Sequence, residues 1–182
     1  LPIPSTSLTQ LTALVRFAII RHCLSMNDIT RHNINGGDVL VDTLIAQGVD
    51  TAFTVSGESF LAALEALRKS QDKIRLVTTR HESGATFAAE AYGKLTGRPA
   101  AVFVSRGPGA TNAAIGVHTA KQDSSPMLLF IGHVRSTSQG KEAFQEIDQA
   151  AMFSPIAKAV LQPNNSNQIA SVTALAAALS TV

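Results

Sequence analysis

The sequence predicts an α/β protein in which an open, mostly parallel sheet is covered by helices on both faces. Two observations support this fold class. Apolar segments typical of strands alternate with segments of helical periodicity, and the strand-like segments are apolar throughout instead of at every second residue. Strands that are apolar on both sides must be buried on both faces, which is the environment of a parallel sheet between two helix layers.

The expected helices are identified by apolar spacing and by residues typical of helix ends. Residues 38–47 have helical periodicity and stop at Gly48, a common residue just after a helix. Residues 81–95 carry Glu82 in the first turn, where a carboxylate interacts favourably with the helix dipole. Further helices are expected over residues 60–69, from the glycine turn at 107–109 to about residue 121, and over 169–179.

Five strands are expected between these helices. They cover residues 49–55, 74–77, 100–104, 127–132 and, as one more, 156–160. In such a sheet, ligands bind beyond the carboxyl ends of the strands. Glycines, carboxylates and histidines follow the first four strands, at residues 56–58, 80–82, 105–109 and 132–133. One edge of the sheet is therefore expected to form a cofactor cleft.

The composition narrows the classes of function. A net charge of +2 with scattered basic residues, 5% aromatic residues and no Trp argues against nucleic-acid binding. The single cysteine, Cys23, excludes an internal disulfide and a cysteine-rich metal site, and the histidines lack metal-ligand spacing, so no metal site is expected in this chain. No apolar run reaches the ~20 residues that a membrane-spanning helix needs, so no membrane association is expected.

The domain organisation is expected to be simple. Residues 1–33 are predicted as a poorly defined N-terminal segment and residues 34–182 as one folded domain. Leu8 to Leu24 has some helical character, but its Arg, Ser and Thr content with scarcely an acid is also typical of a targeting segment. A cytoplasmic location is expected, and organelle targeting by residues 1–25 is left open.

Several common catalytic motifs are missing from the chain. The sequence contains no GxGxxG dinucleotide fingerprint, no Walker loop and no GxSxG nucleophile elbow. Glu82 is followed by Ser83, Gly84 and Ala85, which leave room for a group to approach the helix start. Taken alone, Glu82 is better explained as a helix carboxylate that favours the dipole than as a functional group, so other motifs must decide its role.

Four motifs together suggest one family. They are Arg80-His81-Glu82 with Gly84-Ala85, then Gly107-Pro108-Gly109-Ala110-Thr111-Asn112, then Asp123-Ser124 with Pro126-Met127, and Phe144-Gln145-Glu146. In order and spacing this set resembles the acetolactate synthase-like family of thiamine-diphosphate enzymes. The resemblance covers about residues 35–160 and concerns the N-terminal, pyrimidine-binding domain. It implies the thiamine-diphosphate-binding fold.

The resemblance assigns roles to individual residues. Glu82 corresponds to the catalytic glutamate that hydrogen-bonds the ring nitrogen of the cofactor's aminopyrimidine, favouring the tautomer that removes the thiazolium proton. Cofactor-binding residues implied by the resemblance are Gly57, Pro108, Asn112 and Gln145. Glu58 and His133 are candidates for facing the substrate. For Glu58 the alternative is an ordinary carboxylate in the first turn of a helix. For His133 the alternative is a histidine at a strand end that faces solvent. Ser56, before Gly57, stands where the family usually has proline, so the sequence departs from the family's pattern at this turn.

The resemblance implies a 2-keto acid carboligase or decarboxylase, a transferase or lyase, of which this chain is one part. In the family, diphosphate and Mg²⁺ are held by a different domain, usually from a second subunit. The expected partners are therefore that domain, within a homo-oligomer, and a small 2-keto acid, and the isolated chain is expected to be inactive. FAD in the full enzyme is left open. Alternatives are a separately encoded pyrimidine-binding subunit of a two-subunit 2-keto acid decarboxylase, and a non-catalytic truncated binding module.

Overall fold

The computed structural model describes residues 34–182, which contain one sheet of four parallel strands. The strands are β1 (Thr51–Thr54), β2 (Arg75–Thr78), β3 (Ala100–Ser105) and β4 (Met127–Gly132), in the spatial order β2-β1-β3-β4. Every neighbouring pair is parallel, so the predicted fold class is confirmed. From β1 the chain moves first to one side, to β2, and then to the other side, to β3 and β4. Ligand clefts form at such a switch point.

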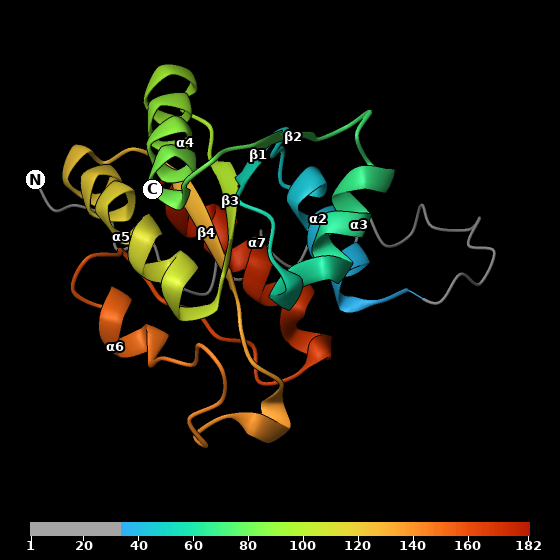
Figure 1. Cartoon of the computed structure of the whole chain (residues 1–182). Helices are drawn as coiled ribbons and strands as arrows, with labels where there is room; N and C mark the ends of the chain where they lie inside the picture. Colours follow the sequence, from blue (N-terminus) through green and yellow to red (C-terminus); the bar gives the residue numbers. More distant parts are fainter. Residues whose placement is uncertain (1–33) are drawn as a thin grey trace, which may run out of the picture. The chain divides into compact units, whose positions relative to one another are not determined.

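Helices cover both faces of the sheet (Figure 1). One face is covered by α2 (Gly36–Ala46), α3 (Leu61–Lys69) and α7 (Ile169–Ser180), and the other by α4 (Glu82–Thr96) and α5 (Arg106–Asp123), with α6 (Gln149–Phe153) beside α5. Short 3₁₀ helices are formed by Glu58–Phe60, Ser136–Ser138 and Ser166–Gln168. The predicted helices correspond to α2, α3, α4, α5 and α7 with slightly different bounds.

The central strand β3 explains why the strand segments are apolar throughout. Phe103 packs into a cluster with side chains of α2, α3 and α7, whereas Val102 and Val104 pack on the opposite face against Ala85 and Ala89 of α4. All five of these residues are almost completely buried. Successive strand residues point to opposite faces, so a strand between two helix layers needs apolar residues at every position.

The strand predicted over residues 156–160 is wrong. Residues 154–158 form turns and bends, and residues 159–163 have no regular structure. A strand needs a neighbour to complete its hydrogen bonds, and a cavity of about 810 Å³ that is lined by both β4 and residues 157–163 occupies the place of that neighbour. Apolar content alone could not reveal this. The possible helix from Leu8 to Leu24 and the targeting segment lie outside the described residues.

A cluster at the start of β1 connects the sheet to α4. The Asp50 carboxylate accepts a hydrogen bond of 2.5 Å from the Tyr92 hydroxyl and forms an ion pair of 2.8 Å with Arg98. The Tyr92 hydrogen bond is the largest of the effects that lower the pKa of Asp50 below its ordinary value of 3.8, with smaller contributions from Thr51 and Arg98. The cluster thus fixes the far end of the helix that carries Glu82.

The lowered pKa predicts a pH dependence of stability. Because the folded state holds Asp50 ionised more strongly than the unfolded state does, the stabilisation is present above pH 3.8 and is lost as pH falls through the folded-state pKa. We expect Asp50→Asn to lower the free energy of unfolding at pH 7, and the difference from the wild type to shrink below pH 3.8. Urea unfolding between pH 7 and pH 2.5 measures this. A difference that is constant with pH contradicts the assignment.

Candidate active site

The residues singled out after each strand lie along one edge of the sheet. Because β1, β2, β3 and β4 are parallel neighbours, their carboxyl ends lie at the same edge. Gly57, Glu82, Gly107 and His133 follow these four ends closely in the chain. The backbone therefore brings the motifs that follow the four strands to the same edge of the sheet, as expected.

Glu82 is the first residue of α4 and is half-buried. The helix starts at this position because the His81 side chain accepts a hydrogen bond from the Ser83 N–H, at 3.2 Å, as an N-cap. Glu82 Oε2 accepts a hydrogen bond of 2.9 Å from Asn112 Nδ2. Among the described residues no donor is bonded to Oε1, which faces the small residue Gly109: a Cβ added there would lie 3.5 Å from it. One carboxyl oxygen is therefore fixed and the other is available.

A close contact between α4 and α5 positions this pair. Gly116 packs against Thr86 so tightly that an added Cβ would lie 2.2 Å from Thr86 Oγ1. Asn112 and Glu82 each stand four residues earlier in their helices, which is one turn. Both helices begin at the same edge of the sheet, so the Gly116–Thr86 contact holds Asn112 against Glu82. Each of these helices thus supplies one member of the pair.

The glycine motif forms the first turn of α5 and not a separate turn before it. Pro108 is tolerated there because the first N–H groups of a helix have no partner within the helix. The Gly107 N–H donates a hydrogen bond of 2.9 Å to the carbonyl oxygen of Gln145. A Cβ at Gly107 would lie 2.9 Å from that oxygen and from Ile147 Cγ2. The glycine is needed because the Gln145 loop crosses the helix start here, which brings two predicted cofactor-binding residues, Pro108 and Gln145, into one region.

The Gln145 loop is held by its neighbour Glu146. The Glu146 carboxylate accepts hydrogen bonds from the N–H groups of Gly140, at 2.7 Å, and Ala143, at 3.0 Å. These backbone donors, Gly140 first, lower the pKa of Glu146. Gln145 itself has a φ of +63°, in the left-handed region that residues other than glycine seldom occupy. The loop thus keeps a strained backbone at the edge of the site.

Arg106 is a residue of the site to which sequence reasoning gave no role. Its Nη1 donates a hydrogen bond of 2.9 Å to Glu58 Oε1, and its guanidinium carbon lies 5.9 Å from the centre of the Phe144 ring. The Arg106 side chain is only 17% exposed, whereas that of Glu58 is 69% exposed. The sequence feature that could have identified Arg106 is its position: it is a basic residue at a strand end, directly before the glycine motif. Arg106 connects the loops that follow β1, β3 and β4.

The other two predicted residues have different surroundings. Gly57 lies against β3, where an added Cβ would stand 2.5 Å from the Ser105 Cβ, so its lack of a side chain allows the ends of β1 and β3 to approach. His133 Nδ1 accepts a hydrogen bond of 2.7 Å from the Val134 N–H. His133 also lines a surface hollow of about 460 Å³, which Glu82 does not line. In the described part of the chain, no hydrogen bond or ion pair joins His133 to the Glu82–Asn112 pair.

Neither a metal site nor a membrane helix is found in residues 34–182. No group of three or more His, Cys, Asp or Glu side chains there is arranged to hold a metal ion. No helix in this range is both long and apolar enough to cross a membrane.

A parallel α/β sheet with a carboxylate–amide pair at its switch-point edge defines a cofactor-binding domain of the doubly wound type. Residues 34–152 match the family model described as "Thiamine pyrophosphate enzyme, N-terminal TPP binding domain", and the chain belongs to this family. Thiamine pyrophosphate is another name for thiamine diphosphate. The resemblance predicted from the four motifs is therefore confirmed.

Individual relatives of known name indicate the same family. The chain is similar to the acetolactate synthase of Bacillus subtilis (strain 168), with 39% identity over 123 residues, covering 68% of this chain and 21% of that protein. It is similar to the acetolactate synthase large subunit of Lactococcus lactis, with 40% identity over 68% of this chain and 21% of that protein. The mitochondrial acetolactate synthase catalytic subunit of Aspergillus candidus is 37% identical over 68% of this chain and 18% of its own length. The chain thus spans about a fifth of the length of these relatives.

Proposed function

We propose that this domain binds the aminopyrimidine ring of thiamine diphosphate and that Glu82 hydrogen-bonds its ring nitrogen through Oε1. The observation that carries the proposal is the hydrogen bonding of the Glu82 carboxyl group. Asn112 donates a hydrogen bond to Oε2, whereas Oε1 receives none from the described residues. The surroundings fit a flat ring, since Gly109 lies beside Oε1 and an added Cβ at Gly84 would meet nothing within 4 Å. When bound, the cofactor supplies a nucleophilic thiazolium carbon.

Each residue of the chain has a defined task in this proposal. Glu82 holds the hydrogen bond to the ring nitrogen and so controls proton transfer on the aminopyrimidine. Asn112 fixes the rotamer of Glu82 by its hydrogen bond to Oε2. Pro108 and the Gln145 loop limit the space at the start of α5 and exclude water from it. Glu58 and Arg106 face the same edge and are proposed to contact the substrate side.

We propose that the complete enzyme is an acetolactate synthase-like carboligase or decarboxylase that acts on a 2-keto acid. The names of the relatives support this class of reaction. The paired Glu82 and Asn112 favour a catalytic domain over a non-catalytic binding module. Diphosphate and Mg²⁺ are proposed to bind to another part of the enzyme, and the isolated chain is proposed to be inactive for this reason.

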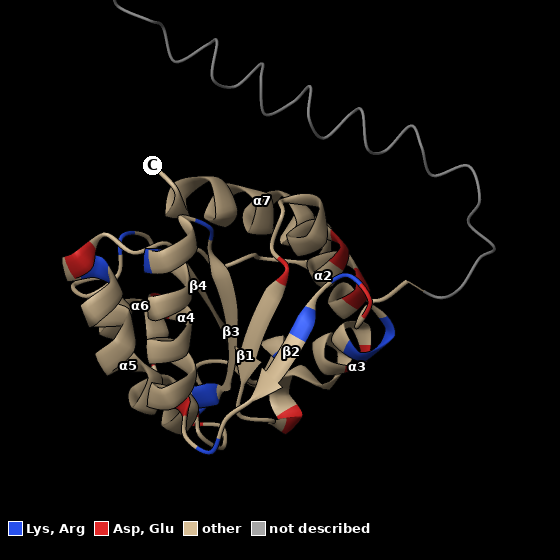
Figure 2. Ribbon diagram, turned by 90° about the horizontal axis from the view of Figure 1, so that it is seen from above, with Lys and Arg blue, Asp and Glu red and all other residues tan. Residues whose placement is uncertain are grey.

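We further propose that a second subunit supplies this other part and docks on the outer surface of α4 and α5. Between their ends these helices contain few charged residues, in contrast to α3 and the segments around it (Figure 2). Phe87 of α4 is 41% exposed and Ile115 of α5 is 58% exposed. Exposed apolar residues beside a binding site are typical of an interface, and this surface adjoins the Glu82–Asn112 pair.

The proposed ring specificity is tested with fragments of the cofactor. We expect 4-amino-5-hydroxymethyl-2-methylpyrimidine to shift the backbone NMR signals of Glu82, Gly109 and Asn112 in the isolated chain, because ring recognition does not require the diphosphate. The thiazole half of thiamine serves as the matched control and is expected to leave these signals unchanged. Equal shifts with both fragments, or shifts confined to residues away from α4 and α5, contradict the proposal.

A further inference from the structure

Arg106 is a largely enclosed cation with one unused edge. Its side chain is 17% exposed, and within the described residues its guanidinium donates one hydrogen bond, from Nη1 to Glu58 Oε1 at 2.9 Å. The edge formed by Nε and Nη2 has no hydrogen-bond partner among the described residues, and the Nε atom is buried. A buried donor without a partner is rare in folded proteins, so we expect the partner of this edge to be a ligand.

A second arginine of the chain shows what a complete pair looks like. Arg68 donates from Nε to Glu65 Oε2 at 2.8 Å and from Nη2 to Glu65 Oε1 at 2.9 Å. This is the two-point contact between a guanidinium edge and a carboxylate, for which arginine is especially suited. Glu58 contacts Arg106 at one point only, through a nitrogen outside this edge. Arg106 can therefore bind a further carboxylate as Arg68 does, while Glu58 stays at Nη1.

The backbone and the Phe144 ring hold Arg106 in place. Its guanidinium carbon lies 5.9 Å from the centre of the Phe144 ring, which is a cation–π contact. The φ of Arg106 is +46°, and the N–H of the next residue, Gly107, is hydrogen-bonded to the Gln145 carbonyl oxygen. Backbone outliers of this kind cluster at ligand and active sites. A cation that is fixed before binding also lowers the entropic cost of holding an anion.

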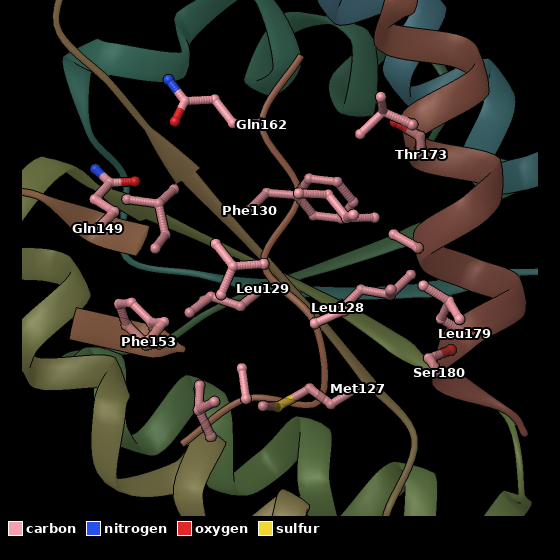
Figure 3. Close-up of a pocket in the computed structure, with 18 of the residues that line it drawn as sticks. Met127, Leu128, Leu129, Phe130, Gln149, Phe153, Gln162, Thr173, Leu179 and Ser180 are labelled. Carbon is pink, nitrogen blue, oxygen red and sulfur yellow. The ribbon is translucent and has the colours of Figure 1, made fainter. Parts of the chain in front are cut away.

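The side chains that contact the Arg106 guanidinium leave a route to it. Glu58 is 69% exposed and Phe144 is 73% exposed, so each can rotate into solvent without giving up much packing. An ion pair with an exposed carboxylate also contributes little to stability, so a shift of Glu58 costs little. This route is distinct from the cavity of about 810 Å³ beside β4, which is lined neither by Arg106 nor by its two contacts (Figure 3).

The unused edge belongs to the same end of the domain as the proposed cofactor site. Arg106 begins α5, and Gly109, three residues later and within the same turn, lies beside Glu82 Oε1. Arg106 also connects the loops that follow β1 and β4, through Glu58 and Phe144. A small molecule whose carboxylate binds to Arg106 is therefore held at the edge of the sheet where Glu82 lies.

The chemistry of the proposed reaction decides which carboxylate this is. In a carboligase reaction the donor 2-keto acid loses CO₂, and the electron pair of the broken bond stays with its keto carbon. That carbon bonds to the carbonyl carbon of the acceptor, whose oxygen takes up a proton. A guanidinium bound to the donor carboxylate would stabilise a charge that disappears in this step and would oppose the loss of CO₂. An acceptor 2-keto acid keeps its carboxylate from binding to product.

We propose that Arg106 binds, through Nε and Nη2, the carboxylate of the acceptor 2-keto acid. The inference rests on the proposed function, because it needs a 2-keto acid at this edge of the sheet, and within that function it favours a carboligase over a decarboxylase. Arg106 is then a specificity-determining residue that selects acceptors with a carboxylate over neutral aldehydes.

The contact is tested by NMR in the full chain, with pyruvate as the probe at constant ionic strength. We expect pyruvate to shift the side-chain Nε–H signal of Arg106 and the backbone N–H signal of Gly107. Methyl pyruvate, which lacks the charge, is the control and is expected to shift neither. The Nε–H signal of Arg68 is expected to stay unchanged with both probes, because Glu65 occupies its edge. Equal shifts with the two probes, or equal shifts of the two arginines, overturn the proposal.

Matched substitutions separate the two-point contact from charge alone. Arg106→Lys keeps the positive charge but has no edge of two nitrogens, so the affinity for pyruvate, read from the Gly107 signal, is expected to fall at least about tenfold. Arg68→Lys is the same substitution on α3 and is expected to leave this affinity unchanged. Unchanged affinity in Arg106→Lys overturns the proposal. If this variant does not fold, the Arg106 Nε–H signal of the wild type decides, because it needs no substitution.

The aminopyrimidine fragment keeps this inference apart from the proposed function. If the fragment shifts the signals of Glu82 and Asn112 while pyruvate leaves Arg106 unchanged, the inference is wrong and the proposed function stands. If pyruvate shifts Arg106 while the fragment has no effect, the carboxylate site stands and the cofactor proposal is wrong.

The role in specificity is tested in the assembled enzyme, with pyruvate as the donor. Arg106→Gln is expected to lower kcat/KM for 2-ketobutyrate as the acceptor at least about tenfold more than for acetaldehyde, which has no carboxylate to lose its partner. Equal losses with the two acceptors would show that Arg106 acts on the structure of the site and not on the carboxylate, and would overturn the proposal.

Discussion

Replacing Glu82 with glutamine in the assembled enzyme is expected to slow exchange of the cofactor's thiazolium proton about 10²–10⁴-fold, the usual contribution of a positioned acid or base. Glutamine keeps the size of the side chain and its hydrogen bond with Asn112, but it cannot exchange a proton with the ring nitrogen. Cofactor binding is expected to weaken only by the contribution of one hydrogen bond, about 0.5–1.5 kcal/mol. Proton exchange is measured by NMR after acid quench in deuterated water, and binding by titration of the apoenzyme.

The control is Glu65→Gln, which removes a carboxylate of α3 that forms an exposed ion pair with Arg68. It is expected to change neither the exchange rate nor cofactor affinity. If Glu82→Gln also left the exchange rate unchanged, Glu82 would be a first-turn carboxylate that only favours the helix dipole. A loss of binding equal to the loss of rate would instead show that Glu82 acts on the bound cofactor as a whole and not on the proton transfer.

The fold could be predicted from the sequence because its strongest signal is local. The apolar runs of β3 and β4 and the helix ends at Gly48 and Glu82 depend only on neighbouring residues. The segment 156–160 shows the limit of this signal. Its composition is that of a strand, but strand formation depends on a partner at its side, which composition does not supply.

The candidate site was predictable to a different extent for each residue. Glu82 and Asn112 were found through their motifs, and the structure brings them within 2.9 Å. Arg106 was not given a role, because its importance arises from contacts with Glu58 and Phe144, which are distant in the chain. Its left-handed backbone, with a φ of +46°, is also a product of the folded chain and has no signal in the sequence.

Replacing Gly116 with alanine is expected to destabilise the domain by about 1–3 kcal/mol, the usual effect of overpacking. The added methyl group would lie 2.2 Å from Thr86 Oγ1 and 2.5 Å from Thr86 Cβ. Thr86 cannot easily rotate away, because its hydroxyl is hydrogen-bonded to the carbonyl oxygens of Glu82 and Ser83. The helices α4 and α5 must therefore move apart. Urea unfolding followed by circular dichroism measures the loss.

Gly84→Ala is the matched control, since it adds the same methyl group to α4 where an added Cβ meets nothing within 4 Å. Without a clash, alanine favours the helix, and this variant is expected to be as stable as the wild type or more stable, by up to about 1 kcal/mol. Because Asn112 and Glu82 are one turn from the Gly116–Thr86 contact, Gly116→Ala is also expected to weaken the response of Glu82 and Asn112 to the aminopyrimidine fragment. A stable Gly116→Ala protein with the same fragment response would show that the close contact of α4 and α5 does not position the pair.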